Sequence, residues 1–149
     1  MTQNIEDYVP VVKYHGLNTT KDIVTTASVK SSSATAGIGY ATGAGGAVTQ
    51  ATNITTGVTV QGTSGTITTV SSTLAAQATA EFIVTNASVA VGDVVAVSTT
   101  YAGAGSPIVS VAQVGAGVFS IVLFNATTAT TALDAVVIIN FAVIKAVSA

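Results

Sequence analysis

VVIINFAVI, residues 136–144, belongs to the longest apolar run of the chain, and VFSIVLF at residues 118–124 has a similar character. Both stretches are rich in β-branched and aromatic residues, which favour strands. A strand with one solvent-exposed face should alternate between apolar and polar residues. Because both faces of these two stretches are apolar, we expect each strand to be covered on both sides.

The cover is expected from two sources, a second sheet of the same chain and a neighbouring copy of it. Full burial of a Val, Ile or Phe side chain contributes roughly 1.5–3 kcal/mol, so an exposed face of this kind favours association. The sequence therefore predicts a homo-oligomer. The residues assigned to its interface are Val137, Ile139, Phe141, Val143, Phe119 and Ile121.

Shorter strand patterns recur through the rest of the chain. They lie at residues 57–61, 66–70, 81–86, 93–99 and 108–114. Turn-forming residues separate them, with Gly43, Gly45 and Gly46 read as one turn and residues 115–117 as a hairpin connection. Seven or eight short strands at this spacing predict an all-β fold, an antiparallel, jelly-roll-like β-sandwich.

The first 39 residues differ from the remainder. They contain three of the four Lys residues and the single His. We interpret residues 1–39 as an extended anchoring arm and linker, and residues 40–149 as the sandwich domain; the alternative is that the arm is the first strand of the same domain. The docking residues of this arm are expected to be Tyr8, Val9, Val11, Val12, Tyr14 and His15.

Charge is scarce, which limits the classes of partner. Only 7% of the residues are charged, against about one quarter in an ordinary domain, and no basic residue lies between Lys30 and Lys145. A net charge of −2 without clustered Lys or Arg argues against nucleic acid. The longest apolar run is about half the length of a membrane-spanning helix, so no membrane partner is expected. No secretory signal opens the sequence, which suggests synthesis in the cytoplasm followed by export as part of a particle.

Catalytic and metal-binding patterns are not expected. His15 lies in the arm without a nucleophile elbow nearby, and Glu81, Asp93 and Asp134 are far apart in the sequence. Asp93 and Asp134 are read as turn residues. With no Cys and no acidic cluster of calcium-loop spacing, we predict a non-enzymatic protein without metal or cofactor.

Four segments carry a resemblance to a known family. They are GIGYATGAGGAVTQAT at residues 37–52, TGVTV at 56–60, GTIT at 65–68 and INFAVIK at 139–145. Together they resemble a module that recurs in small virion proteins of tailed bacteriophages. The resemblance covers about 110 residues, from Gly37 to the end, and leaves the arm outside it.

The resemblance implies a structural part of the virion without catalytic residues. The expected role is a capsid decoration, cement or head-fibre subunit that binds the major capsid protein or another virion protein. A homotrimer is expected by analogy with other virion parts. The alternatives are a tail or tail-fibre component and, in a different class, a surface adhesin or carbohydrate-binding module.

Overall fold

The structure is a computed structural model that describes residues 28, 30–35, 37–71 and 73–146. The chain divides into two compact units, residues 1–38 and 39–149, and the second unit is called the body below. The described residues of the first unit form neither helix nor strand. All six residues assigned to arm docking, from Tyr8 to His15, lie outside the described residues.

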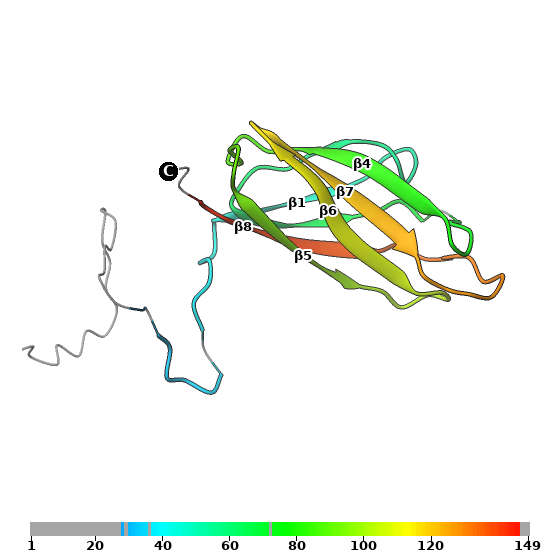
Figure 1. Ribbon diagram of the computed structural model, residues 1–149, viewed down its shortest axis with the longest axis horizontal. Helices are drawn as coiled ribbons and strands as arrows, with labels where there is room; N and C mark the ends of the chain where they lie inside the picture. The colour runs from blue at the N-terminus through cyan, green and yellow to red at the C-terminus, as the bar shows by residue number, and fades with distance from the viewer. Residues whose placement is uncertain (1–27, 29, 36, 72, 147–149) are drawn as a thin grey trace, which may run out of the picture. The chain divides into compact units, whose positions relative to one another are not determined.

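Two four-stranded sheets pack face to face in the body (Figure 1). Sheet A has the order β1-β3-β8-β5, and sheet B has the order β2-β4-β7-β6. The strands of sheet A are β1 (Gly45–Thr49), β3 (Ser64–Thr68), β8 (Ile138–Ile144) and β5 (Val94–Thr100). Those of sheet B are β2 (Val58–Thr59), β4 (Thr79–Thr85), β7 (Val118–Asn125) and β6 (Pro107–Gly115). The prediction of an all-β sandwich is confirmed.

The expectation that every strand pair is antiparallel is wrong for two of them. β1 pairs with β3, and β2 with β4, in parallel, so both sheets are mixed. The reason is the path of the chain, which alternates between the sheets through its first strands. A parallel pair needs a crossover connection, and here each crossover passes through a strand of the opposite sheet.

Alternate residues of the long strands form the core between the sheets. In β4, Phe82 and Val84 are buried, whereas Glu81 and Ile83 point outward. The Phe119 ring of β7 packs on the Phe141 ring of β8, with ring centroids 5.5 Å apart. The core is therefore made by contacts between the two sheets of one chain.

The six side chains assigned to the oligomer interface belong to this core. Their exposed fractions are at most 4%: Val137, Ile139, Phe141, Val143, Phe119 and Ile121. The interface prediction placed on them is therefore corrected, because the facing sheet already covers these side chains. A partner could reach only the opposite faces of the same strands.

Of the two predicted turns, the one at residues 115–117 is present, and the one at Gly43, Gly45 and Gly46 is present only in part. The β6–β7 hairpin is present, with Gly115 opposite Val118 and Gly117 at a φ of +74°. In contrast, Gly45 and Gly46 lie inside β1, and only Gly43 keeps a turn conformation, with a φ of +95°. A Cβ on Gly46 would lie 2.6 Å from the Gln61 carbonyl oxygen, so close backbone packing explains this glycine.

Candidate functional site

The body has two chemically different ends. Strand pairing places Gly45, the start of β1, near the end of β8, where Ile144 pairs with Val94. We call this the entry end, because the chain enters β1 there. The opposite end, where Thr100 pairs with Ile138, is called the far end and carries the loops at residues 101–106 and 126–137.

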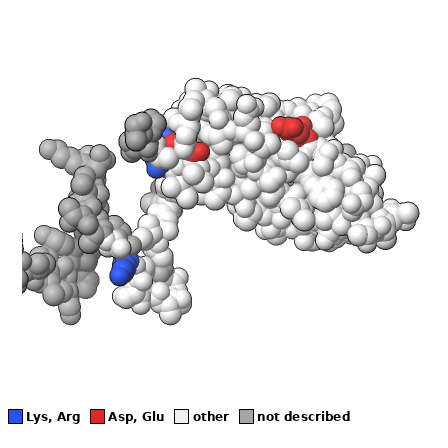
Figure 2. Space-filling model, in the orientation of Figure 1, with Lys and Arg blue, Asp and Glu red and all other residues white. Residues whose placement is uncertain are grey.

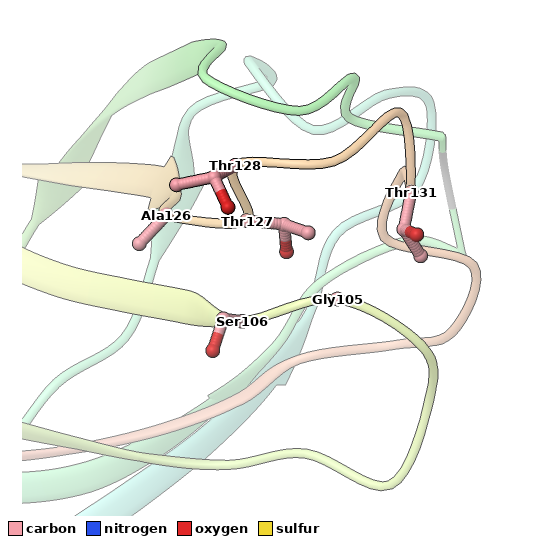
Figure 3. A pocket seen from close by; sticks show the side chains of 6 residues that line it. All are labelled: Gly105, Ser106, Ala126, Thr127, Thr128 and Thr131. Carbon is pink, nitrogen blue, oxygen red and sulfur yellow. The ribbon is translucent and has the colours of Figure 1, made fainter.

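A pocket of about 370 Å³ lies among the loops of the far end. Figure 3 shows the six residues that line it: Gly105, Ser106, Ala126, Thr127, Thr128 and Thr131. Four of them carry hydroxyl groups and none is titratable. The pocket therefore provides hydrogen-bond donors and acceptors for a neutral polar ligand, and its lining residues provide no acid or base.

Asn125 holds the loops around this pocket. Its side-chain amide donates to the carbonyl oxygens of Leu74 and Thr131, each at 3.0 Å. Its side-chain oxygen accepts from the Thr127 hydroxyl at 2.8 Å and from the Ser106 backbone N–H at 3.3 Å. Since Asn125 is fully buried, these bonds fix three loops at one point. No local pattern in the sequence indicates this role of Asn125.

Asp134 has a structural role at the same end. Its carboxylate accepts from the Ala104 backbone N–H at 2.7 Å, and Tyr101 lies within 3.2 Å of the same oxygen. The Tyr101 hydroxyl lies 2.6 Å from the Ala104 carbonyl and accepts from the Asp134 backbone N–H at 2.9 Å. The two residues therefore connect the loop at residues 101–106 to the segment that precedes β8.

Asp93 forms an ion pair at the entry end. Its carboxylate lies 2.5 Å from the Lys145 ammonium group and accepts from the Ala90 backbone N–H at 2.8 Å. The hydrogen bond from Lys145 is the largest of the effects that lower the pKa of Asp93 below its ordinary value of 3.8. The hydrogen bond from the Ala90 backbone N–H is the second largest. Asp93 therefore stabilises a turn, as predicted, and in addition fixes the end of β8.

The two outer faces of the sandwich differ in polarity. The outer face of sheet A carries mostly Thr, Ser, Ala and Gly, and its exposed large apolar residues are Val94 and Ile144, where β5 pairs with β8 at the entry end. On sheet B, Ile83, Ile108 and Val118 are exposed by 47%, 55% and 36%, and Val122 and Phe124 are half-buried beside them. We call these five residues the sheet B patch. Three of them, Val118, Val122 and Phe124, lie on β7 and point away from the core residues Phe119 and Ile121 of the same strand.

Charged groups are few on the surface that Figure 2 shows, and scattered where they occur. The body contains only Glu81, Asp93, Asp134 and Lys145 as charged side chains. Among the described residues, no group of three His, Cys, Asp or Glu side chains is close enough to hold a metal ion. Within the same residues, the structure contains no helix of the length and apolar character needed to cross a membrane.

No family model, no curated protein and no solved structure matches this chain.

Proposed function

We propose that the chain is a structural protein of a tailed-bacteriophage virion, a capsid decoration, cement or head-fibre subunit. The observation that carries the proposal is the body's surface, which is built from Thr, Ser, Ala and Gly and has four charged side chains. Two of these four, Asp93 and Lys145, pair with each other, and Asp134 is bound to backbone. Such groups stabilise the fold, which suits a permanently assembled part rather than a catalyst.

The proposed attachment uses the arm. An extended segment can add a strand to the edge of another protein's sheet, where backbone hydrogen bonds provide affinity. Tyr8, Val9, Val11, Val12, Tyr14 and His15 are the proposed docking residues, and the major capsid protein or another virion protein is the proposed partner. The protein would be made in the host cytoplasm and carried on the virion.

The proposed assembly is a homotrimer. The core residues cannot form its interface, so we assign contact between copies to the sheet B patch. This surface is apolar and lies on the face that the facing sheet does not cover. Cyclic association through such a surface is the common arrangement of soluble oligomers.

Deletion of residues 1–30 tests the attachment. The truncated chain should fold, because the body has its own core, and should no longer bind particles that lack the protein. Binding is measured by co-sedimentation of purified protein with such particles, and circular dichroism of the truncated chain provides the control for folding. Full binding by the truncated chain would contradict the role of the arm.

A carbohydrate-binding or adhesin module is the second candidate, and the pocket at the far end favours it. Hydroxyl groups of Ser106, Thr127, Thr128 and Thr131 could hydrogen-bond a sugar. A glycan array with the intact protein tests this function, with Thr128→Val as the variant that should lose any signal. Electron microscopy of labelled particles separates the head location from a tail or tail-fibre location.

A further inference from the structure

Exposed apolar side chains gather at the entry end of the body. Val91, Val94 and Ile144 are exposed by 69%, 55% and 55%, and Tyr40 by 46%. Val94 pairs with Ile144 across β5 and β8, so both side chains lie on the outer face of sheet A. Single exposed apolar residues are ordinary on a protein surface, whereas a group of them marks a contact site.

Hydrogen bonds hold the other two side chains close to this pair. The Tyr40 hydroxyl donates to the carbonyl oxygen of Val143, next to the end of β8. Val91 lies in the turn that leads into β5, where the Asp93 N–H donates to the Ala90 carbonyl at 3.2 Å. The four apolar side chains therefore lie together, and we call them the entry-end surface: Tyr40, Val91, Val94 and Ile144.

A hollow of about 220 Å³ adjoins the entry-end surface on sheet A. Its floor is the paired backbone of β5 and β8 with the short side chains of Ala96 and Ala142, which lie opposite each other. On the side of the entry end stands the exposed apolar pair of these two strands, and on the other side Ser98 pairs with Asn140. The hollow therefore has one apolar side and one polar side. Side chains that carry much of the binding energy of a protein interface fill pockets of this kind.

The charges at this end cancel. Of the four charged side chains of the body, Asp93 and Lys145 lie here and pair with each other, whereas Glu81 lies on β4 and Asp134 at the far end. A nucleic acid requires free Lys or Arg side chains, which the entry end does not offer. The entry-end surface therefore suits an uncharged protein surface from which an apolar side chain projects.

We propose that the entry-end surface binds the same virion protein as the arm, and that an apolar side chain of that protein fills the hollow. The inference rests on the proposed function and extends the attachment from the arm to the body. The body begins at Gly39, directly before Tyr40, so a protein held by the arm is kept close to this end. A second contact with a tethered partner adds to affinity, because the tether raises the effective concentration of the partner.

Val94→Thr combined with Ile144→Thr tests the apolar side of the contact. With the arm intact, this variant should bind particles that lack the protein at least about tenfold more weakly, since two apolar contacts are lost. Co-sedimentation over a range of particle concentrations measures the dissociation constant, and circular dichroism provides the control for folding. Equal binding by the variant and the wild type would overturn the proposal.

Ala96→Leu fills the hollow, and Ala47→Leu is its matched control. Both alanines are exposed on the outer face of sheet A, in the edge strands β5 and β1, and Ala47 does not line the hollow. Ala96→Leu should weaken particle binding several-fold, whereas Ala47→Leu should bind as the wild type does. Equal effects of the two substitutions would overturn the role of the hollow.

Photo-crosslinking identifies what covers the entry-end surface. The full chain with Val91→p-benzoylphenylalanine should form an adduct with another virion protein on the particle, which mass spectrometry identifies. The same group at Ala102, in the loop of the far end, should not form it. An adduct of Val91→p-benzoylphenylalanine with a second copy or within its own chain would overturn the proposed partner, as would equal adducts from both positions.

The same experiments separate this inference from the proposed function. A wild-type chain that does not bind particles would contradict the proposed function and the inference together. Wild-type binding that is lost on deletion of residues 1–30 but unchanged by the substitutions at the entry end would leave the role of the arm intact and overturn this inference alone.

Discussion

Asp93 shows how one charged side chain is used in a body that has very few. The carboxylate is buried, accepts hydrogen bonds from the backbone N–H groups of Ala90 and Ala146, and pairs with Lys145. Through these contacts it joins the turn before β5 to the end of β8. Its ionised form is therefore part of the folded structure.

The lowered pKa of Asp93 predicts a specific loss of stability in acid. A carboxyl group whose pKa is lower in the folded state stabilises that state above the unfolded pKa, here 3.8. This stability is lost as the pH falls through the folded pKa. Asp93→Asn should therefore lower Tm by more at pH 7 than at an acidic pH below 3.8, because the stabilisation by the ionised wild-type group declines as the pH falls.

Thermal unfolding by circular dichroism at the two pH values measures this difference. Lys145→Met removes the main cause of the lowered pKa and should reproduce most of the effect of Asp93→Asn at pH 7. The double variant should lose little more than either single variant. An equal loss of Tm for Asp93→Asn at both pH values would contradict the role of ionisation.

The role of Asn125 in joining three loops could not be predicted from the sequence. Its partners, Leu74, Ser106 and Thr131, are separated from one another in the sequence and meet only after the strands have paired. No local pattern indicates that meeting point. The turn role of Asp93, in contrast, was predictable, because Gly92 and a following strand pattern surround it.

At the scale of the strand, substitutions on the two faces of β8 should differ in their effect on stability. Ile139 is fully buried in the core, whereas Ile144, five residues along the same strand, is 55% exposed. Ile139→Ala should lower the free energy of unfolding by about 2–5 kcal/mol, because it removes buried methyl groups and leaves a cavity. Ile144→Ala should cost less than about 0.5 kcal/mol in an isolated copy.

Urea unfolding of dilute protein measures both values. If Ile139 instead contacted a neighbouring copy, Ile139→Ala would change the concentration dependence of unfolding and leave the stability of the single copy nearly intact. The comparison therefore tests the corrected assignment of this face directly.

The strand patterns predicted which segments are strands better than they predicted how those strands pair. The pattern at residues 81–86 overlaps β4, and the Gly115–Gly117 connection indicated the hairpin. The parallel pairs were missed because pairing of β1 with β3 depends on β2 lying in the opposite sheet. The apolar character of β8 on both sides was recognised, but period-two alternation alone does not say which side faces the core.

At the scale of the whole molecule, the scarcity of charge leaves apolar and hydroxyl groups to mediate contacts. The outer face of sheet A offers mostly small and hydroxyl-bearing side chains, and the sheet B patch offers Ile, Val and Phe. Association of copies through the patch would bury apolar surface and leave the far-end pocket exposed. The sheet B patch would then contact other copies, and the far end would remain accessible to other ligands.

This arrangement predicts that substitutions on the two outer faces have different effects on assembly. Ile83→Thr combined with Ile108→Thr removes the two most exposed apolar side chains of the sheet B patch and should shift the full chain toward monomer. Val94→Thr combined with Ile144→Thr makes a matched change on sheet A, where the two residues pair with exposed fractions of 55% each, and should leave the oligomer unchanged. Light scattering at several protein concentrations measures the mass of each variant, and unfolding curves confirm that all of them fold. A monomeric wild-type chain, or equal dissociation by both pairs of substitutions, would contradict assembly through the patch.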